Sequence, residues 1–237
     1  MNPEKPKAIF LDLDDTIVTW DAVSEPVWKN VCVKFAPRVP GVESDHLYKV
    51  INEVRRWYMT DPDRFRFLRL NLEKARREIV SIAFQRLGLN LPALAVELAD
   101  TYTVDRVTAT SLIPGAIETL KHYQMSGSRL ALLTNGDSST QRGKIERFGL
   151  APYFEFIIIE SEFGCGKPDE RVFNQALKNF SISPSEAWMV GDDLTMDISG
   201  AQNAGISTVW VDWRGVGLPS GSRVNPDRIV KTISELK

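Results

Sequence analysis

The sequence lacks the features that mark several classes of protein. Its 237 residues include two cysteines, Cys32 and Cys165, which lie far apart. They offer neither a disulfide framework nor zinc-type spacing, and they favour a reducing compartment. No apolar run approaches the roughly 20 residues of a membrane span, and the polar segment Met1–Lys7 lacks the apolar core of a signal peptide. Lysine and arginine number 29 against 31 aspartates and glutamates, which does not favour nucleic-acid binding. We therefore expect a cytoplasmic protein without a nucleic-acid or membrane partner.

Short apolar runs that end in polar residues or glycine predict a β-sheet. They are Ala8–Asp12, Arg129–Thr134, Phe156–Glu160, Ala187–Gly191 and Thr208–Asp212. Segments of helical character follow the later strands: Ser139–Phe148, Asp169–Phe180 and Leu194–Ala204. Strands that alternate with helices indicate an α/β fold with a doubly wound, Rossmann-like parallel sheet. Beyond the last strand we predict a loop over Trp213–Pro226 and a closing helix over Ile229–Leu236.

The region 21–111 has a different pattern, with no strong strand signal. Apolar residues at helical spacing, separated by prolines, predict four helices: Ala22–Phe35, Glu43–Thr60, Arg64–Leu87 and Ala93–Ala109. Four consecutive helices can form a small bundle of their own. We therefore expect an α/β core made of residues 1–20 and 112–237, interrupted by an inserted α-helical bundle at 21–111.

The first predicted strand ends in a concentrated group of acids. Asp12, Asp14 and Asp15 fall within four positions, and no lysine or arginine separates them. The alternation of side chains along a strand points Asp12 and Asp14 to one side. Carboxylates this crowded repel one another unless a cation lies between them, and Mg²⁺ prefers oxygen ligands. The pattern predicts a divalent metal site at the carboxyl edge of the sheet, where α/β folds bind ligands.

Three further polar segments should reach the same edge. Thr134-Asn135-Gly136 ends a strand with a hydroxyl, an amide and a glycine, and Gly164–Asp169 brackets Lys167 with glycines before a helix. Gly191–Asp197 ends a strand with two acids and adds a third close behind. Acids for a metal, one cation and small hydrogen-bonding groups suit a phosphoryl group, whose transfer depends mainly on positioning and charge neutralisation.

In this order and at these spacings, the four segments resemble the motifs of the haloacid dehalogenase superfamily of phosphohydrolases. The family's motifs are Asp-x-Asp-x-Thr, an apolar strand ending in Thr or Ser, a lysine, and Gly-Asp with a further acid. The matching residues are Asp12, Asp14 and Thr16, then Thr134, then Lys167, then Asp192, Asp193 and Asp197. A helical cap inserted after the first motif is also a family trait, so the resemblance covers the whole chain.

The resemblance implies a Mg²⁺-dependent phosphatase with an aspartyl-phosphate intermediate. Asp12 would be the nucleophile, and Asp14 would protonate the leaving group and then activate water. The Asp12 carboxylate, the Asp14 carbonyl and Asp192 would hold Mg²⁺. The remaining roles concern the phosphate and the outer part of the metal site. Thr134, Asn135 and Lys167 would bind the phosphate, Lys167 also as a catalytic cation, while Asp193 and Asp197 would act at the metal or through its waters.

Asp14 favours a phosphatase over a 2-haloacid dehalogenase, because an ester oxygen needs a proton on leaving and a halide does not. A phosphotransferase or mutase, a dehalogenase and a non-catalytic member of the superfamily remain the alternatives. The segment Thr134–Gly136, followed by Gln141 and Lys144, resembles the branch of the superfamily that contains 5′-nucleotidases and acyl-sugar phosphate phosphatases. We therefore expect a small phosphorylated metabolite, such as a nucleotide or sugar phosphate, as the substrate of a monomer or homodimer.

Two groups of residues allow more than one interpretation. Asp193 is a second-shell metal residue or a helix cap. Seven arginines crowd the second and third predicted helices of the cap: Arg55, Arg56, Arg64, Arg66, Arg69, Arg76 and Arg77. A solvated helix face is the favoured interpretation for them, and contact of one or two with an anionic part of the substrate is the alternative.

Overall fold

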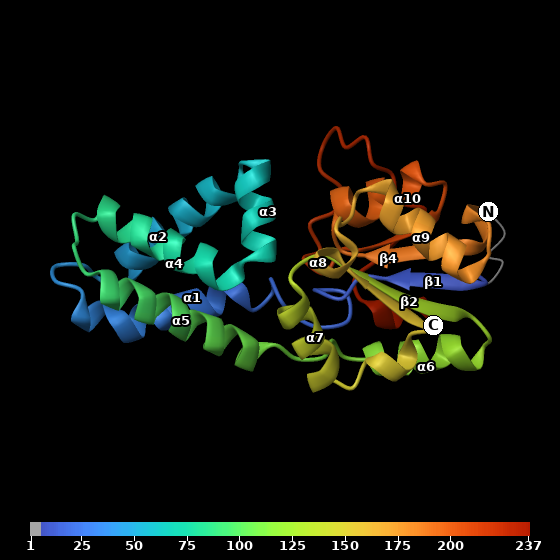
Figure 1. Cartoon of the computed structure of the whole chain (residues 1–237), viewed down its shortest axis with the longest axis horizontal. Coiled ribbons are helices and arrows are strands. Elements are labelled where there is room, and N and C mark those ends of the chain that lie inside the picture. The colour runs from blue at the N-terminus through green and yellow to red at the C-terminus, as the bar shows by residue number, and fades with distance from the viewer. Residues whose placement is uncertain (1–5) are drawn as a thin grey trace. The chain divides into compact units, whose positions relative to one another are not determined.

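The computed structural model describes residues 6–237 (Figure 1). The first five residues of the polar segment Met1–Lys7 lie outside this range. The chain divides into two compact units, one formed by Met1–Thr19 with Ser111–Lys237 and the other by Trp20–Thr110. We call them the α/β unit and the helical unit. Within residues 6–237, no helix combines the length and the apolar character needed to cross a bilayer.

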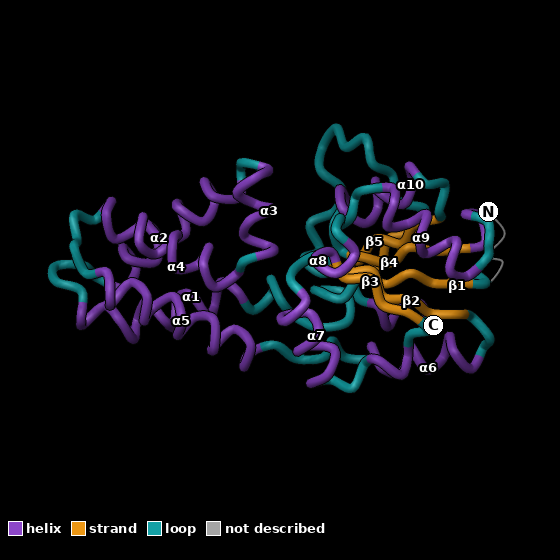
Figure 2. Tube along the Cα trace, viewed as in Figure 1, coloured by secondary structure: helices purple, strands orange, loops and turns teal. Residues whose placement is uncertain are grey.

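The α/β unit is built on a six-stranded parallel sheet with the order β3-β2-β1-β4-β5-β6 (Figure 2). The strands are β1 (Ala8–Leu11), β2 (Arg129–Thr134), β3 (Phe156–Ile159), β4 (Ala187–Gly191), β5 (Ser207–Val211) and β6 (Arg228–Val230). The order reverses direction at β1, which pairs with both β2 and β4. This is the topological switch point at which doubly wound sheets bind ligands. The predicted fold class is confirmed.

Helices cover both faces of this sheet because the central strands are apolar on both faces. Ile9 and Leu11 of β1 pack on one face in a cluster with α6, whereas Ala8 and Phe10 pack on the other face with α9. Figure 1 shows α6 and α9 on opposite sides of β1. The helices of this unit are α6 (Ala116–Met125), α7 (Ser138–Arg147), α8 (Glu160–Phe163), α9 (Glu170–Phe180) and α10 (Gly200–Asn203).

Two predicted helices of the α/β unit are wrong in part. The closing helix expected over Ile229–Leu236 is strand β6 followed by a 3₁₀ turn, Ile233–Leu236. Asp227 sets the register of β6, because its carboxylate accepts the Thr208 backbone N–H of β5 at 2.8 Å. The helix expected over Leu194–Ala204 is a π-helical segment, Leu194–Ser199, that runs into α10.

The helical unit contains five α-helices rather than the four predicted. They are α1 (Ser24–Phe35), α2 (Ser44–Met59), α3 (Pro62–Leu70), α4 (Leu72–Arg86) and α5 (Pro92–Ala109). The single helix expected over Arg64–Leu87 breaks at Asn71, whose backbone is non-helical at φ −143° and ψ 53°. The Asn71 side chain donates to the Phe67 carbonyl, a local bond with which asparagine competes against helix continuation. The unit has an apolar core made of residues of its own helices.

Candidate active site

The site begins where β1 and β4 end side by side. Asp12 directly follows β1, and its backbone N–H donates to the Val190 carbonyl of β4 at 2.9 Å. Lys167, from the segment that precedes α9, places its Nζ 2.6 Å from Asp12 Oδ1 and 2.6 Å from Asp197 Oδ1. Only 2% of Lys167 is exposed, so this ammonium is held between the two carboxylates away from water. Segments 155 positions apart in the chain therefore meet at one point.

Three carboxylates gather around this lysine. Oxygen atoms of Asp12, Asp192 and Asp197 all lie within 4.8 Å of one another. The Asp197 carboxylate also accepts the backbone N–H of Asp193 at 3.0 Å. A side chain at Gly191 would collide with the Asp197 carboxylate, so the end of β4 must be glycine for Asp197 to enter the cluster.

Burial and mutual repulsion dominate the electrostatics of this cluster. Burial raises the pKa of Asp12 to about 8, because the charges of Asp197 and Asp14 add to a burial effect that Lys167 only partly offsets. Burial, with the charges of Asp12 and Asp197, raises the pKa of Asp192 to about 9. Burial would lower the pKa of Lys167, but the two carboxylates beside it reverse the direction and raise it. The three carboxylates of this cluster offer only oxygen ligands and carry surplus negative charge, which fits a hard divalent cation such as Mg²⁺.

Asp192 is held by two tryptophans that the sequence did not single out. The indole N–H of Trp213 donates to Asp192 Oδ2 at 3.0 Å, and that of Trp210 donates to the Asp192 carbonyl at 2.8 Å. Trp210 lies at the end of β5, next to Gly191 of β4 in the sheet register. The position of this carboxylate is thus fixed from the neighbouring strand and from the loop beyond it.

Asp14 lies apart from this cluster and has a lysine of its own. Lys144 Nζ lies 2.5 and 2.8 Å from the two Asp14 carboxylate oxygens and is 5% exposed. Gln141 donates from one amide to Asp14 Oδ2 at 3.2 Å and to the Thr134 hydroxyl. Gln141 and Lys144 are three positions apart on α7, so both occupy one face of that helix. The two aspartates of the first segment therefore pair with different lysines.

The loop that carries Lys167 is fixed by Asn135. The Asn135 side-chain amide donates to the Lys167 carbonyl at 2.7 Å and accepts from the Lys167 backbone N–H at 2.8 Å. Beside it, the Glu160 carboxylate accepts the Gly136 N–H at 3.0 Å. A side chain at Gly166 would collide with both Glu160 and Asn135. The side chain of Asn135 is thus committed to holding the loop, and only its backbone stays available for a ligand.

The structure arranges the residues singled out from the sequence in three ways. Asp12, Lys167, Asp192 and Asp197 come together, and Asp14 joins Thr134 through Gln141. Asp193 acts as a helix cap, because its carboxylate accepts the N–H groups of Thr195 and Met196 at 2.8 Å. The sequence analysis named Gln141 and Lys144 as part of a branch pattern but did not predict their contacts with Asp14, which their helical spacing could have suggested. It missed Trp213, which lies in a loop without a recognisable pattern.

Comparison with known proteins decides the family. The family model for haloacid dehalogenase-like hydrolases matches residues 6–205. The chain belongs to this family. The match confirms the family and the hydrolase class that the four segments predicted.

Individual relatives agree with this membership, and a solved structure shows the same fold. The glyceraldehyde 3-phosphate phosphatase of Pyrococcus furiosus is 32% identical over 207 residues, covering 86% of this chain and 80% of the relative. The pyrimidine 5′-nucleotidase YjjG of Escherichia coli is 27% identical over 232 residues, 97% of this chain and 95% of the relative. The hydrolase YfnB of Bacillus subtilis has the same fold, with a TM-score of 0.72 at 22% identity over 98% of this chain and 97% of that one.

Proposed function

We propose that the protein is a Mg²⁺-dependent phosphatase that hydrolyses a small phosphomonoester through a phosphorylated Asp12. The observation that carries the proposal is that Asp12 and Asp14, two positions apart in the sequence, have different partners. Asp12 belongs to a carboxylate cluster around Lys167, whereas Asp14 has its own partners in Lys144 and Gln141. In this proposal Asp12 attacks phosphorus and Asp14 transfers protons, and their separate partners support that division. Relatives named as a glyceraldehyde 3-phosphate phosphatase and a pyrimidine 5′-nucleotidase support this activity.

In this proposal the metal lies among the carboxylates. The side chains of Asp12 and Asp192, the Asp14 carbonyl and Asp197, directly or through water, would hold Mg²⁺. Bound there, Mg²⁺ supplies positive charge to the phosphoryl oxygens. Lys167 adds a second cation for the same oxygens and keeps Asp12 aligned. The Thr134 hydroxyl and the Asn135 backbone N–H complete the phosphate site.

The reaction then takes two steps. A carboxylate oxygen of Asp12 forms a bond to phosphorus while the ester bond breaks, and Asp14 gives its proton to the departing oxygen. A water molecule next attacks the phosphorus, Asp14 accepts its proton, and the bond between Asp12 and phosphorus breaks to release phosphate. Lys144 and Gln141 hold the Asp14 carboxylate in place for both transfers. We further propose that the helical insert acts as a cap that admits substrate and then excludes water from the intermediate.

The test is hydrolysis of p-nitrophenyl phosphate by the purified chain. We expect turnover with Mg²⁺, loss of turnover with a chelator, and loss in Asp12→Asn. Asp45→Asn, an exposed aspartate of α2, is the matched control and should keep full activity. Acid-stable radiolabel from a labelled phosphate ester should appear on the protein during turnover and be absent from Asp12→Asn. Turnover that survives Asp12→Asn would rule out the nucleophile.

The alternatives give different products. Transfer of label to an added sugar, in place of release as phosphate, would identify a phosphotransferase or mutase. Chloride release from a 2-haloacid would identify a dehalogenase. Lack of turnover across a broad panel of phosphate esters would leave a non-catalytic member of the family.

A further inference from the structure

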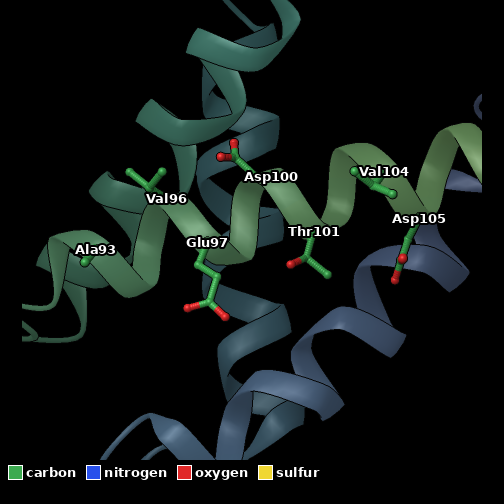
Figure 3. Close-up of a pocket in the computed structure, with 7 residues that line it drawn as sticks. All are labelled: Ala93, Val96, Glu97, Asp100, Thr101, Val104 and Asp105. Carbon is green, nitrogen blue, oxygen red and sulfur yellow. The ribbon is translucent and has the colours of Figure 1, made fainter.

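Polar groups that already have partners within the chain leave little for a ligand to satisfy. Three acids of α5 line a pocket of about 550 Å³ in the helical unit (Figure 3). Each acid contacts a basic side chain from a neighbouring segment of that unit at 2.6 to 2.7 Å; the pairs are Glu97 with Arg38, Asp100 with Arg77, and Asp105 with Lys34. The chain itself satisfies this set. The hydroxyl that ends β2 in the α/β unit is different, because only part of its hydrogen-bonding capacity is used.

This hydroxyl belongs to Thr134, which is 3% exposed, so little of it is open to water. A hydroxyl can donate one hydrogen bond and accept two. Among residues 6–237, its one hydrogen-bond partner is the side-chain amide of Gln141. The direction of that bond therefore decides what the hydroxyl can still offer to a ligand.

The direction follows from a second contact of the same amide nitrogen. Gln141 Nε2 lies 3.2 Å from Asp14 Oδ2, and the oxygens of that carboxylate also contact the Lys144 ammonium at 2.5 and 2.8 Å. A carboxylate accepts hydrogen bonds, so the end of the Gln141 amide beside it must be the NH₂ group rather than the carbonyl. That group has two N–H donors and no acceptor. Its second N–H therefore donates to Thr134 Oγ1.

The Thr134 oxygen is thus an acceptor toward Gln141, which leaves its own proton for another partner. Within the described range, 6–237, no group of the chain accepts a hydrogen bond from this proton. A buried donor without an acceptor is costly and rare. Leu132 pairs with Leu11 across β2 and β1, so Thr134 and the Asp12–Asp14 segment leave the sheet at the same edge. The acceptor that completes this hydroxyl is expected there.

The start of α7 holds the amide in its orientation. Gln141 is 2% exposed, and its backbone N–H donates to the Asp137 carbonyl at 3.1 Å. Asp137 also caps the helix, because its carboxylate accepts the Thr140 N–H at 2.9 Å. Glutamine suits this position because one nitrogen offers two donors. Methionine would fill the same space without donating, and glutamate would present acceptors alone.

We propose that Gln141 is a positioning residue that fixes the Thr134 hydroxyl as a hydrogen-bond donor to the phosphoryl group of the substrate. The oxygens of an ionised phosphoryl group accept and do not donate, so a hydroxyl held as a donor matches them. The same nitrogen holds Asp14, so one amide aligns the phosphate-binding hydroxyl with the acid that transfers protons. The identity of the ligand as a phosphoryl group rests on the proposed function, whereas the donor direction of Thr134 does not.

The first test is a double-mutant cycle on phosphate binding. Inorganic phosphate is titrated by calorimetry into the full chain at saturating Mg²⁺, and a melting curve checks the fold of each variant. Thr134→Val should weaken binding about fivefold, the scale of one hydrogen bond. Gln141→Met should weaken it about threefold, because the hydroxyl proton is then free among three staggered positions. In the Thr134→Val background, Gln141→Met should have almost no further effect, since both act on one hydrogen bond.

A second cycle reverses the polarity of the contact. Glutamate has the shape of glutamine, but its oxygen would take the Thr134 proton away from phosphate. Gln141→Glu also adds a negative charge, and the Thr134→Val background measures that effect alone. We expect Gln141→Glu to weaken phosphate binding about fivefold more when Thr134 is present than in Thr134→Val. Gln85→Met, at an exposed glutamine of α4, is the control for the methionine substitution and should bind phosphate as the wild type does.

The contrary outcomes are distinct from failure of the proposed function. If Gln141→Met weakens phosphate binding by the same factor with and without Thr134, the amide does not act through the hydroxyl, and the inference is overturned. Unchanged binding in Thr134→Val, or no measurable binding of phosphate by the wild type, would overturn it as well. Lack of hydrolysis of any ester would reject the proposed function, while the two binding cycles would still decide the role of Gln141.

Discussion

The two units surround their buried cations with different groups. In the α/β unit, the buried lysines each contact carboxylates directly, Lys167 with Asp12 and Asp197, and Lys144 with Asp14. In the helical unit, the buried Arg106 pairs with Asp21 at 2.6 Å and also lies over the Trp20 ring, whereas the half-buried Arg55 lies over the Trp28 ring and donates to neutral oxygens. Charged groups are rarely buried without a partner, and here carboxylates serve the lysines while aromatic rings and neutral oxygens also serve the arginines.

The cluster of the α/β unit also carries surplus negative charge. Around Lys167, three carboxylates face one ammonium, and burial raises the pKa of Asp192 to about 9 and that of Asp12 to about 8. In the proposed function a divalent cation would complete this set. The experiments below separate the contributions of its members.

The largest effect is expected at Asp14, which distinguishes proton transfer from metal binding within the α/β unit. Asp14→Asn should lower kcat by about 10²- to 10⁴-fold, the usual contribution of a positioned acid or base. Mg²⁺ affinity, measured by calorimetry, should change little, because the Asp14 carboxylate contacts Lys144 and Gln141 rather than the acid cluster. A near-normal rate would show that another group donates the proton. A large loss of Mg²⁺ affinity would place this side chain at the metal.

Removing the shared ammonium should break the charge pattern of the α/β unit. Lys167→Met should cost at least about 2 kcal/mol of transition-state stabilisation, the scale of one preorganised donor. The measurement is kcat/KM on p-nitrophenyl phosphate with saturating Mg²⁺. Lys178→Met, an exposed lysine of α9, is the control and should behave as the wild type. A loss below threefold would place Lys167 outside the working site.

Lys144 should matter through Asp14 alone. Lys144→Met should lower kcat by about tenfold, since a misplaced catalytic group reduces rate sharply, and should leave KM nearly unchanged. Lys144→Arg, which keeps a cation beside Asp14, should recover part of the rate. Lys121→Met, on the exposed side of α6, serves as the matched control. An equal effect on KM, or no recovery by arginine, would indicate a role other than positioning Asp14.

The sequence predicted those parts of the molecule that depend on local pattern and sheet topology. Strand ends carry the site segments to one edge wherever the sheet is parallel, so Asp12, Lys167 and Asp192 could be brought together without coordinates. The break at Asn71 and strand β6 were missed, because a side-chain bond and pairing with β5 override the apolar spacing there. The arginines of the helical unit were seen only as a crowd. Their roles depend on which of them face aromatic rings and which face carboxylates, and helical spacing alone does not contain that information.

The smallest effect is expected at Trp213, which tests whether the acid cluster depends on a residue outside the family's four motifs. Trp213→Phe keeps an aromatic ring and removes only the N–H that donates to Asp192 Oδ2. Loss of one hydrogen bond should weaken Mg²⁺ binding by about fivefold and leave kcat at saturating Mg²⁺ nearly unchanged. Trp57→Phe, an exposed tryptophan of the helical unit, should change neither quantity. If Trp213→Phe instead lowers kcat at every Mg²⁺ concentration, the indole acts on the reacting groups, and the division between a metal-holding Asp192 and a proton-transferring Asp14 would have to be redrawn.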